Sequence, residues 1–193
     1  MTDTNSIDQG TQPPKPPPRR WDVDLITSIV AIVIGVFAVC TSFYTALIMR
    51  EQLRAQVWPA LEIAGSDASP GFKVLVINNG VGPAIVKRVR ISVGGKPMHN
   101  WGDVFGHFGE DRDYKLFSTV SNTIIPANSR IAALVITDKE LAKRLVPHLA
   151  TLDKRLCYCS VLNECWQIDS GNKTPTGDPV ASCGIPDKDD FKD

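Results

Sequence analysis

The sequence has no excess of charge of either sign. Its 193 residues include 21 Lys and Arg and 21 Asp and Glu, which leave a formal net charge of zero at pH 7. Proteins that bind nucleic acid usually carry a strong basic patch or stripe, and the basic residues here form none. We therefore expect no nucleic-acid partner.

Residue patterns of known enzyme chemistry are scarce. The chain has three histidines, and the only close set is His99, Asp103 and His107, spaced by four residues. Glycines within this stretch disfavour the helix that would bring the three side chains together. The nucleophile elbow that would support a Ser/His/Asp triad does not occur either. The sequence predicts a non-enzyme without catalytic or metal-binding residues.

One glycine cluster invites a phosphate-binding interpretation. It reads NNGVGPA over residues 78–84. The spacing fits neither the dinucleotide fingerprint nor the P-loop, and the pattern that follows is a strand instead of a helix. Asn-Gly permits positive φ and Pro83 restricts the exit, so we expect a turn between two strands. No cofactor is predicted.

Charge is absent from residues 25–49, LITSIVAIVIGVFAVCTSFYTALIM. At 1.5 Å per residue, about 20 such residues cross a hydrocarbon core of about 30 Å. A cleavable signal peptide would be shorter and end at a small-x-small site, but Tyr44 stands where a small residue is needed. Val39 before Cys40 also argues against lipoprotein processing. We predict an uncleaved signal anchor that passes the membrane once, with Cys40 an ordinary apolar residue in lipid.

Small residues recur along one stripe of this span at alternating spacings of three and four. In lipid, helices associate by close packing, so such a stripe is a candidate surface for association with a second helix. The stripe consists of Ser28, Ala31, Gly35, Ala38, Ser42 and Thr45. The alternative is that the spacing is chance, because such residues are frequent in any membrane helix.

The rest of the chain divides into four segments. Residues 1–24 have five prolines and no aliphatic cluster, which predicts a disordered Pro-rich tail. Residues 50–58 continue the helix as a stalk that Trp58-Pro59 should end. Residues 59–183 form one domain, and residues 184–193 are expected to be a disordered acidic tail.

The domain pattern is mainly β. Apolar or alternating runs at 60–64, 72–78, 85–93, 131–137, 156–161 and 165–169 are separated by turn signals. Short strands at this spacing indicate a sandwich or barrel. One short helix interrupts them, with Thr137 and Glu140 as a capping box, a leucine face, and Pro147 limiting it to about two turns.

Residues 72–93 carry a resemblance to a known family. The motif VINNGVGPA, followed by an apolar and basic strand, resembles the turn of bacterial immunoglobulin-like, adhesion-related (CARDB-like) domains. The layout of one span, the WPAL segment and a late CYCSV…ECW hairpin resembles uncharacterised single-pass bacterial membrane proteins. The resemblance implies an immunoglobulin-like β-sandwich that binds or spaces and does not catalyse.

Four of the five cysteines lie late in the chain, at Cys157, Cys159, Cys165 and Cys183. An even number with close spacing is typical of disulfides in an oxidising compartment. Of the three connectivities we favour Cys159–Cys165 within a hairpin and Cys157–Cys183; a zinc site and free buried thiols remain alternatives. Basic residues flank the span almost equally, so the cysteines decide the sidedness. We predict a periplasmic C-terminal domain.

Aromatic residues gather in a Gly-rich stretch, residues 99–113. Trp101, Phe105 and Phe108 belong either to the core or to an exposed loop that binds a partner. Together these features predict a membrane-anchored binding or scaffold protein of the bacterial inner membrane, with a protein partner or self-association. The first alternative is a cytoplasm-facing sensor, signalling or defence subunit. The second and less favoured alternative is an envelope enzyme.

Overall fold

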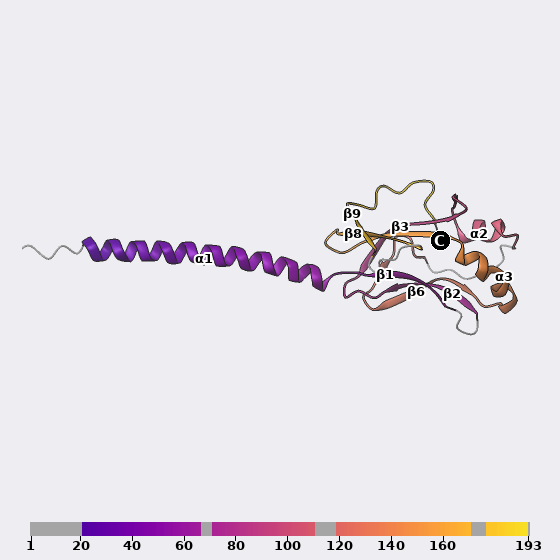
Figure 1. Cartoon of the computed structure of the whole chain (residues 1–193), viewed down its shortest axis with the longest axis horizontal. Coiled ribbons are helices and arrows are strands. Elements are labelled where there is room, and N and C mark those ends of the chain that lie inside the picture. Colours follow the sequence, from indigo (N-terminus) through magenta and orange to yellow (C-terminus); the bar gives the residue numbers. More distant parts are fainter. Residues whose placement is uncertain (1–20, 67–70, 111–118, 171–176, 193) are drawn as a thin grey trace, which may run out of the picture. The chain divides into compact units, whose positions relative to one another are not determined.

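A computed structural model describes residues 21–66, 71–110, 119–170 and 177–192. The chain divides into two compact units, Met1–Ile48 and Met49–Asp193, and Figure 1 follows it from the first helix into the sheets. Helix α1 begins at Trp21, inside the expected Pro-rich tail, so that tail is shorter than predicted. The remainder of the predicted tail, residues 1–20, lies outside the described residues.

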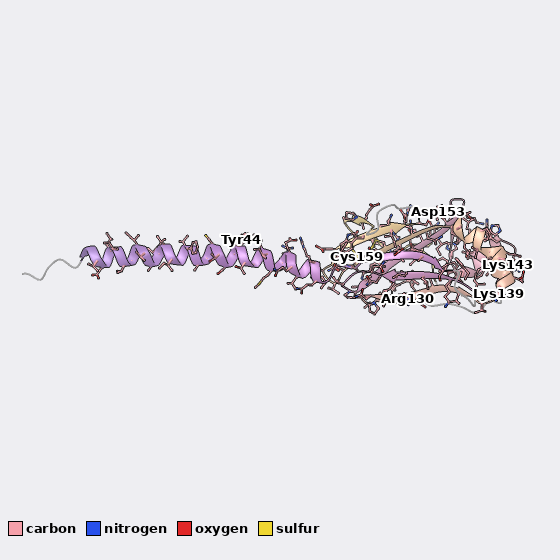
Figure 2. All side chains as sticks on the ribbon, turned by 60° about the horizontal axis from the view of Figure 1, so that its bottom comes forward. Tyr44, Arg130, Lys139, Lys143, Asp153 and Cys159 are labelled. Carbon is pink, nitrogen blue, oxygen red and sulfur yellow. A yellow bond between two sulfur atoms is a disulfide. The ribbon has the colours of Figure 1, made fainter. Side chains whose placement is uncertain are left out.

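Helix α1 (Trp21–Gln56) is 36 residues long. It contains the one helix segment of the described chain that is long and apolar enough to cross a membrane, Val23–Gln56, and the apolar part of this segment is not buried by other residues. Its side chains radiate on all sides, Tyr44 among them (Figure 2). The helix continues through the predicted stalk and ends two residues before Trp58.

In the described part of the chain, nine strands form two antiparallel sheets. Sheet A has the order β1-β2-β6, with β1 at Leu61–Ser66, β2 at Phe72–Asn78 and β6 at Ser129–Ile136. Sheet B has the order β4-β3-β7-β8-β9, with bounds Lys96–Met98, Ala84–Val93, Asp153–Cys159, Cys165–Asp169 and Asp178–Val180. The short β5 (Ile124–Ile125) pairs with β3. The predicted combination of one apolar helix and antiparallel sheets is therefore present.

One hydrophobic cluster joins the two sheets. Val76 and Leu134 of sheet A and Val86, Leu156 and Tyr158 of sheet B belong to it and are 3% exposed or less. Residues that alternate with these along β3 and β7 face away from the cluster, because successive side chains of a strand point to opposite sides. The core therefore lies between the sheets, and sheet B presents an outer face.

Two helices differ from the sequence predictions. Helix α2 (Trp101–His107) forms in the stretch expected to be a loop, because Asn100 caps it by accepting a hydrogen bond from the Asp103 N–H. Helix α3 (Lys139–Ala150) runs 12 residues and includes Pro147, so it exceeds the predicted two turns. Its N-cap is Asp138, not the predicted Thr137. Its leucine face, as predicted, is buried.

The NNGVGP turn seats the start of the domain. Asn78 is fully buried, and its amide oxygen accepts from the backbone N–H groups of Ala60 at 3.2 Å and Gly80 at 3.0 Å. The amide nitrogen lies 2.9–3.1 Å from three carbonyl oxygens, those of Gly82, Ile125 and Pro126. A Cβ on Gly82 would stand 2.0 Å from the Val57 carbonyl oxygen. The turn is therefore a docking point for the segment that leaves α1.

This arrangement makes the stability of the fold sensitive to loss of the Asn78 side chain. Replacement by Ala should lower the free energy of unfolding by about 3 kcal/mol, since several buried backbone groups lose their partner at once. Asn79→Ala is the matched control, because its exposed side chain makes one hydrogen bond to Glu62 and should contribute about 0.5 kcal/mol or less. Thermal unfolding of the full chain in detergent micelles measures both. Equal losses in the two variants would contradict the role of Asn78.

Candidate functional site: the outer face of sheet B

Register places a row of polar and sulfur-bearing residues on the outer face of sheet B. Arg88 pairs with Cys157 and Arg90 with Arg155 across β3 and β7. On the other side of β7, Cys157 pairs with Gln167 and Arg155 with Asp169 of β8. The intervening residues Val89, Leu156 and Ile168 are buried in the core, so the row itself faces outward. Arg88 and Arg90 of the alternating run 85–93 therefore share this outer face. Val86, which strict alternation would place with them, is buried in the core, next to the register shift between Val86 and Arg88.

Two disulfides brace this face. Cys159 and Cys165 are register partners on β7 and β8, with their Cα atoms 4.0 Å apart. Cys157 joins Cys183, at a Cα separation of 5.6 Å and 26 residues along the chain. These are the pairs that the sequence analysis favoured over the other connectivities. Cys40 is a free, exposed cysteine on α1.

The zinc alternative requires cysteine thiolates that lie close together. The sulfur atoms of Cys159, Cys165 and Cys183 lie within 4.8 Å of one another, close enough to share an ion. Each is part of a disulfide here, and a zinc ligand must be a thiolate. In this oxidised form the cluster does not offer the four thiolates that the zinc alternative requires.

The C-terminal strap, residues 181–192, crosses the outer face after Cys183. Two arginines of β3 hold it: Arg88 Nε lies 2.8 Å and Arg90 Nε 3.0 Å from Asp190 Oδ1. Both guanidinium groups also pair with Asp187. Asp190 is only 8% exposed, so these ion pairs are better shielded from water than ordinary surface pairs.

The strap ends inside the core. Phe191 is 2% exposed, its N–H donates to the Val89 carbonyl at 2.8 Å, and its ring packs edge-on against Trp101 at 5.2 Å. The Lys192 N–H donates to the His99 carbonyl at 2.7 Å. The prediction of a disordered acidic tail is therefore wrong for residues 184–192. Residue 193 lies outside the described part.

A groove of about 640 Å³ opens on the same face beside the strap. Its charged lining is balanced, with Arg90, Lys154 and Arg155 against Asp153, Asp169 and Asp189. Asp153 lies at the periphery of the domain (Figure 2). Arg155 Nε is 2.7 Å from Asp169 Oδ1, so part of this charge is already neutralised. A lining of this composition can accept a polar ligand.

Lys154 forms the inner wall of the groove. Its Nζ donates to the carbonyl oxygens of Leu149, in the last turn of α3, at 2.9 Å and of Leu152, just beyond the helix, at 3.1 Å. Lys154 thereby caps the C-terminal end of α3. Burial lowers the pKa of this ammonium group, partly opposed by the nearby Asp153 carboxylate. The side chain therefore ties α3 to β7 and leaves little of its charge to a ligand.

The predicted aromatic partner loop does not exist as an exposed surface. Trp101 is 3% and Phe105 2% exposed, and both belong to the core. Phe108 is half-buried and stacks on His148 at 4.5 Å. The helix that formed in place of a loop turns these rings inward, so the interpretation as core residues is right. His99 and His107 stand at opposite ends of α2, and Asp103 accepts the His99 backbone N–H.

The small-residue stripe of α1 is exposed along its whole length. Its hydroxyl groups donate to carbonyl oxygens of the preceding turn: Ser28 to Asp24, Ser42 to Ala38 and Thr45 to Thr41. An added Cβ on Gly35 would meet nothing within 4 Å. The stripe therefore carries only small side chains, and these hydroxyl groups are hydrogen-bonded within the helix. Its role in association stays a prediction.

Sequence reasoning missed the site that the strap forms. The signal was present, because Arg88 and Arg90 fall on the wet positions of an alternating strand and the last residues are rich in Asp. Opposite charges separated by about a hundred residues reveal no contact until the fold brings them together. Phe191 was the second signal, since a single aromatic residue in an acidic segment can hold that segment on the domain by packing into its core.

The strap predicts a pH-dependent stability. Burial alone would raise the pKa of Asp190, but hydrogen bonds from the Asp187 N–H and from the Arg90 and Arg88 guanidinium groups outweigh it and lower the pKa. The stabilisation is thus present above the ordinary aspartate pKa and is lost as the pH falls through the lowered pKa of the folded state. Asp190→Asn should cost about 2 kcal/mol at pH 7.

Thermal unfolding of the two proteins between pH 7 and pH 2 measures this. The difference between the wild-type chain and Asp190→Asn should shrink only at the acidic end of the range. Asp189→Asn is the control, since the half-buried Asp189 adjoins Asp190, whereas the ion pairs of Arg88 and Arg90 are made with Asp187 and Asp190; its replacement should change stability little. A constant difference across the pH range would refute the assignment.

Comparisons of the chain with protein-family models, curated proteins and solved structures find no match. The resemblance of residues 72–93 to CARDB-like domains therefore stays a prediction.

Proposed function

We propose that this chain is a membrane-anchored, non-catalytic binding or scaffold protein of the bacterial inner membrane. In this proposal α1 is the signal anchor and the disulfide-braced domain lies in the periplasm. The observation that carries the proposal is the pair of disulfides in the unit that follows the apolar helix. Disulfides form and persist in oxidising compartments and are rare in the cytosol.

The strand order supports an immunoglobulin-like domain. In such sandwiches strands A, B and E share one sheet, while C, F and G share the other with C′ beside C. The orders β1-β2-β6 and β4-β3-β7-β8 correspond to A-B-E and C′-C-F-G. The short β5 pairs with β3, not with sheet A where strand D belongs, and β9 extends the second sheet. We take the domain as a variant of this architecture, which commonly serves binding.

The proposed mechanism is tethering. An anchor keeps the domain in a thin layer next to the membrane, and a partner in the same layer meets it at a high effective concentration. Weak contacts are then sufficient for association. The groove beside the strap, with its balanced charges, is the surface we propose for a polar partner segment.

A topology experiment tests the proposal. Cells expressing the full chain with Cys40→Ser are treated with a membrane-impermeant maleimide, with and without reductant, before and after each membrane is permeabilised. We expect labelling only after the outer membrane is opened and reductant is added. Cys40→Ser leaves four thiols to be counted, all in the domain.

The opposite labelling pattern would favour the alternative function over the proposed one. Labelling without reductant, and only after the inner membrane is opened, would place the domain in the cytosol with reduced cysteines. The proposal of an envelope scaffold would then fail, and the cytoplasm-facing sensor or signalling subunit would replace it.

Self-association through α1 is the second part of the proposal. The exposed stripe around Gly35 lets two backbones approach closely, so Gly35→Leu should reduce association several-fold. Val33→Leu is the matched control, because it lies outside the stripe and keeps the helix apolar. Energy transfer between two differently labelled chains in liposomes measures both variants. Equal transfer in the wild-type chain and Gly35→Leu would exclude the stripe as the interface.

A further inference from the structure

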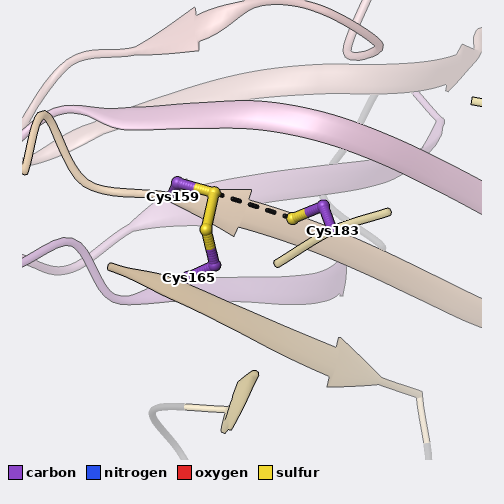
Figure 3. Close-up of side chains that lie close together, drawn as sticks. All are labelled: Cys159, Cys165 and Cys183. Carbon is purple, nitrogen blue, oxygen red and sulfur yellow. Dashed lines mark hydrogen bonds between the residues drawn. A yellow bond between two sulfur atoms is a disulfide. The ribbon is translucent and has the colours of Figure 1, made fainter. Parts of the chain in front are cut away.

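The two disulfides touch each other. Cys159 Sγ lies 3.7 Å from Cys183 Sγ, so one sulfur of each bond faces one sulfur of the other (Figure 3). Neither atom carries a hydrogen while both bonds are intact, so the approach is a van der Waals contact and not a hydrogen bond. A thiolate released at either position would therefore find a disulfide sulfur next to it.

We propose that this cluster is a thiol–disulfide exchange site for a dithiol reductant, in which the strap changes its tether from Cys157 to Cys159. The reductant belongs to the class of small or protein dithiols that can close an intramolecular disulfide. The proposal concerns the sulfur chemistry of the domain and holds on either side of the membrane.

Exposure selects the point of attack. Cys157 and Cys159 are each 4% exposed and Cys165 is 8% exposed, whereas Cys183 on the strap is half-buried. Exchange requires an attacking thiolate to reach a disulfide sulfur. The reductant therefore meets Cys183 first, and the strap is the part of the cluster that it opens.

The chemistry balances in three steps. A thiolate of the dithiol attacks Cys183 Sγ, the Cys157–Cys183 bond breaks, and Cys157 leaves as a thiolate that takes a proton. The second thiol of the reductant then displaces Cys183, which leaves as a thiolate while the reductant closes its own disulfide. Finally the Cys183 thiolate attacks Cys159 Sγ, forming Cys159–Cys183 and releasing Cys165, which takes the second proton. The dithiol loses two electrons and two protons, and the protein gains two thiols.

The product differs from either simple reduction. Cys157 and Cys165 are thiols, yet the strap remains covalently attached to β7 through Cys159. The β7–β8 hairpin loses its own cross-link, since Cys165 is freed. One two-electron reduction thus removes the disulfide of the β7–β8 hairpin while the strap stays covalently attached.

Trapping tests this on the full chain in detergent micelles, with Cys40→Ser as background. Dithiothreitol is added below the amount that reduces both disulfides, the reaction is quenched with acid, and free thiols are alkylated before peptide mass mapping. We expect the main singly reduced species to contain Cys159–Cys183 with alkylated Cys157 and Cys165. Alkylation of Cys157 with Cys183, of Cys159 with Cys165, or a Cys165–Cys183 bond as the main product would overturn the proposal.

Paired variants provide an independent readout. In the same Cys40→Ser background, Cys157→Ser with Cys165→Ser leaves the two touching cysteines, which should oxidise to one intramolecular disulfide. Cys159→Ser with Cys183→Ser leaves Cys157 and Cys165, which should stay as two thiols under the same oxidation. Equal disulfide formation in both would refute the exchange. If either variant fails to fold, the trapping result on the chain with its four domain cysteines decides alone.

Discussion

A buried side-chain amide holds the domain together at the point where the chain enters it. Asn78 binds Ala60, the residue before β1, and also the turn between the sheets through Gly80 and Gly82 and the β5 segment through Ile125. Backbone groups at such a crossing have no regular ladder to pair with, and a buried unpaired group is costly. One Asn meets them all because its amide both accepts and donates.

The seat that Asn78 builds has a consequence for the anchor. Gly82 comes so close to Val57 that no side chain fits between them, and Arg54 Nε lies 2.9 Å from Glu164 Oε1 on the β7–β8 connection. The last turn of α1 is thereby held by the loops of its own unit, Met49–Asp193.

The outer face of sheet B concentrates three kinds of bond in one small area. A disulfide fixes the start of the strap, shielded ion pairs hold its middle, and an aromatic ring buries its end. A reductant would break the disulfide, acid would weaken the ion pairs, and a smaller side chain at Phe191 would remove the packing. The balanced groove next to the strap shares Arg90 with these ion pairs. The strap and the groove therefore share a boundary, since the strap residue Asp189 also lines the groove.

Local patterns predicted much of this protein. The absence of charge in residues 25–49, the alternation in 85–93 and the leucine spacing in 139–150 are short-range signals, and the helix, the sheet faces and the buried face of α3 followed from them. The close cysteine spacing was enough to favour the pairs that the structure contains. Errors arose where one local rule was outweighed by another or by tertiary packing: Asn100 caps a helix among glycines through a local hydrogen bond, and Trp101 and Phe105 pack into the core.

Only the tertiary structure decided the fate of the last residues and the place of the candidate site. Composition makes Asp187 and Asp190 look solvated, because their arginine partners lie on β3, about a hundred residues earlier. The contact between the two disulfides is likewise invisible in the chain, since it depends on strand register and on the path of the strap. Spacing along a sequence determines which side chains share a face, whereas the distance between faces and termini is set only when the whole core closes.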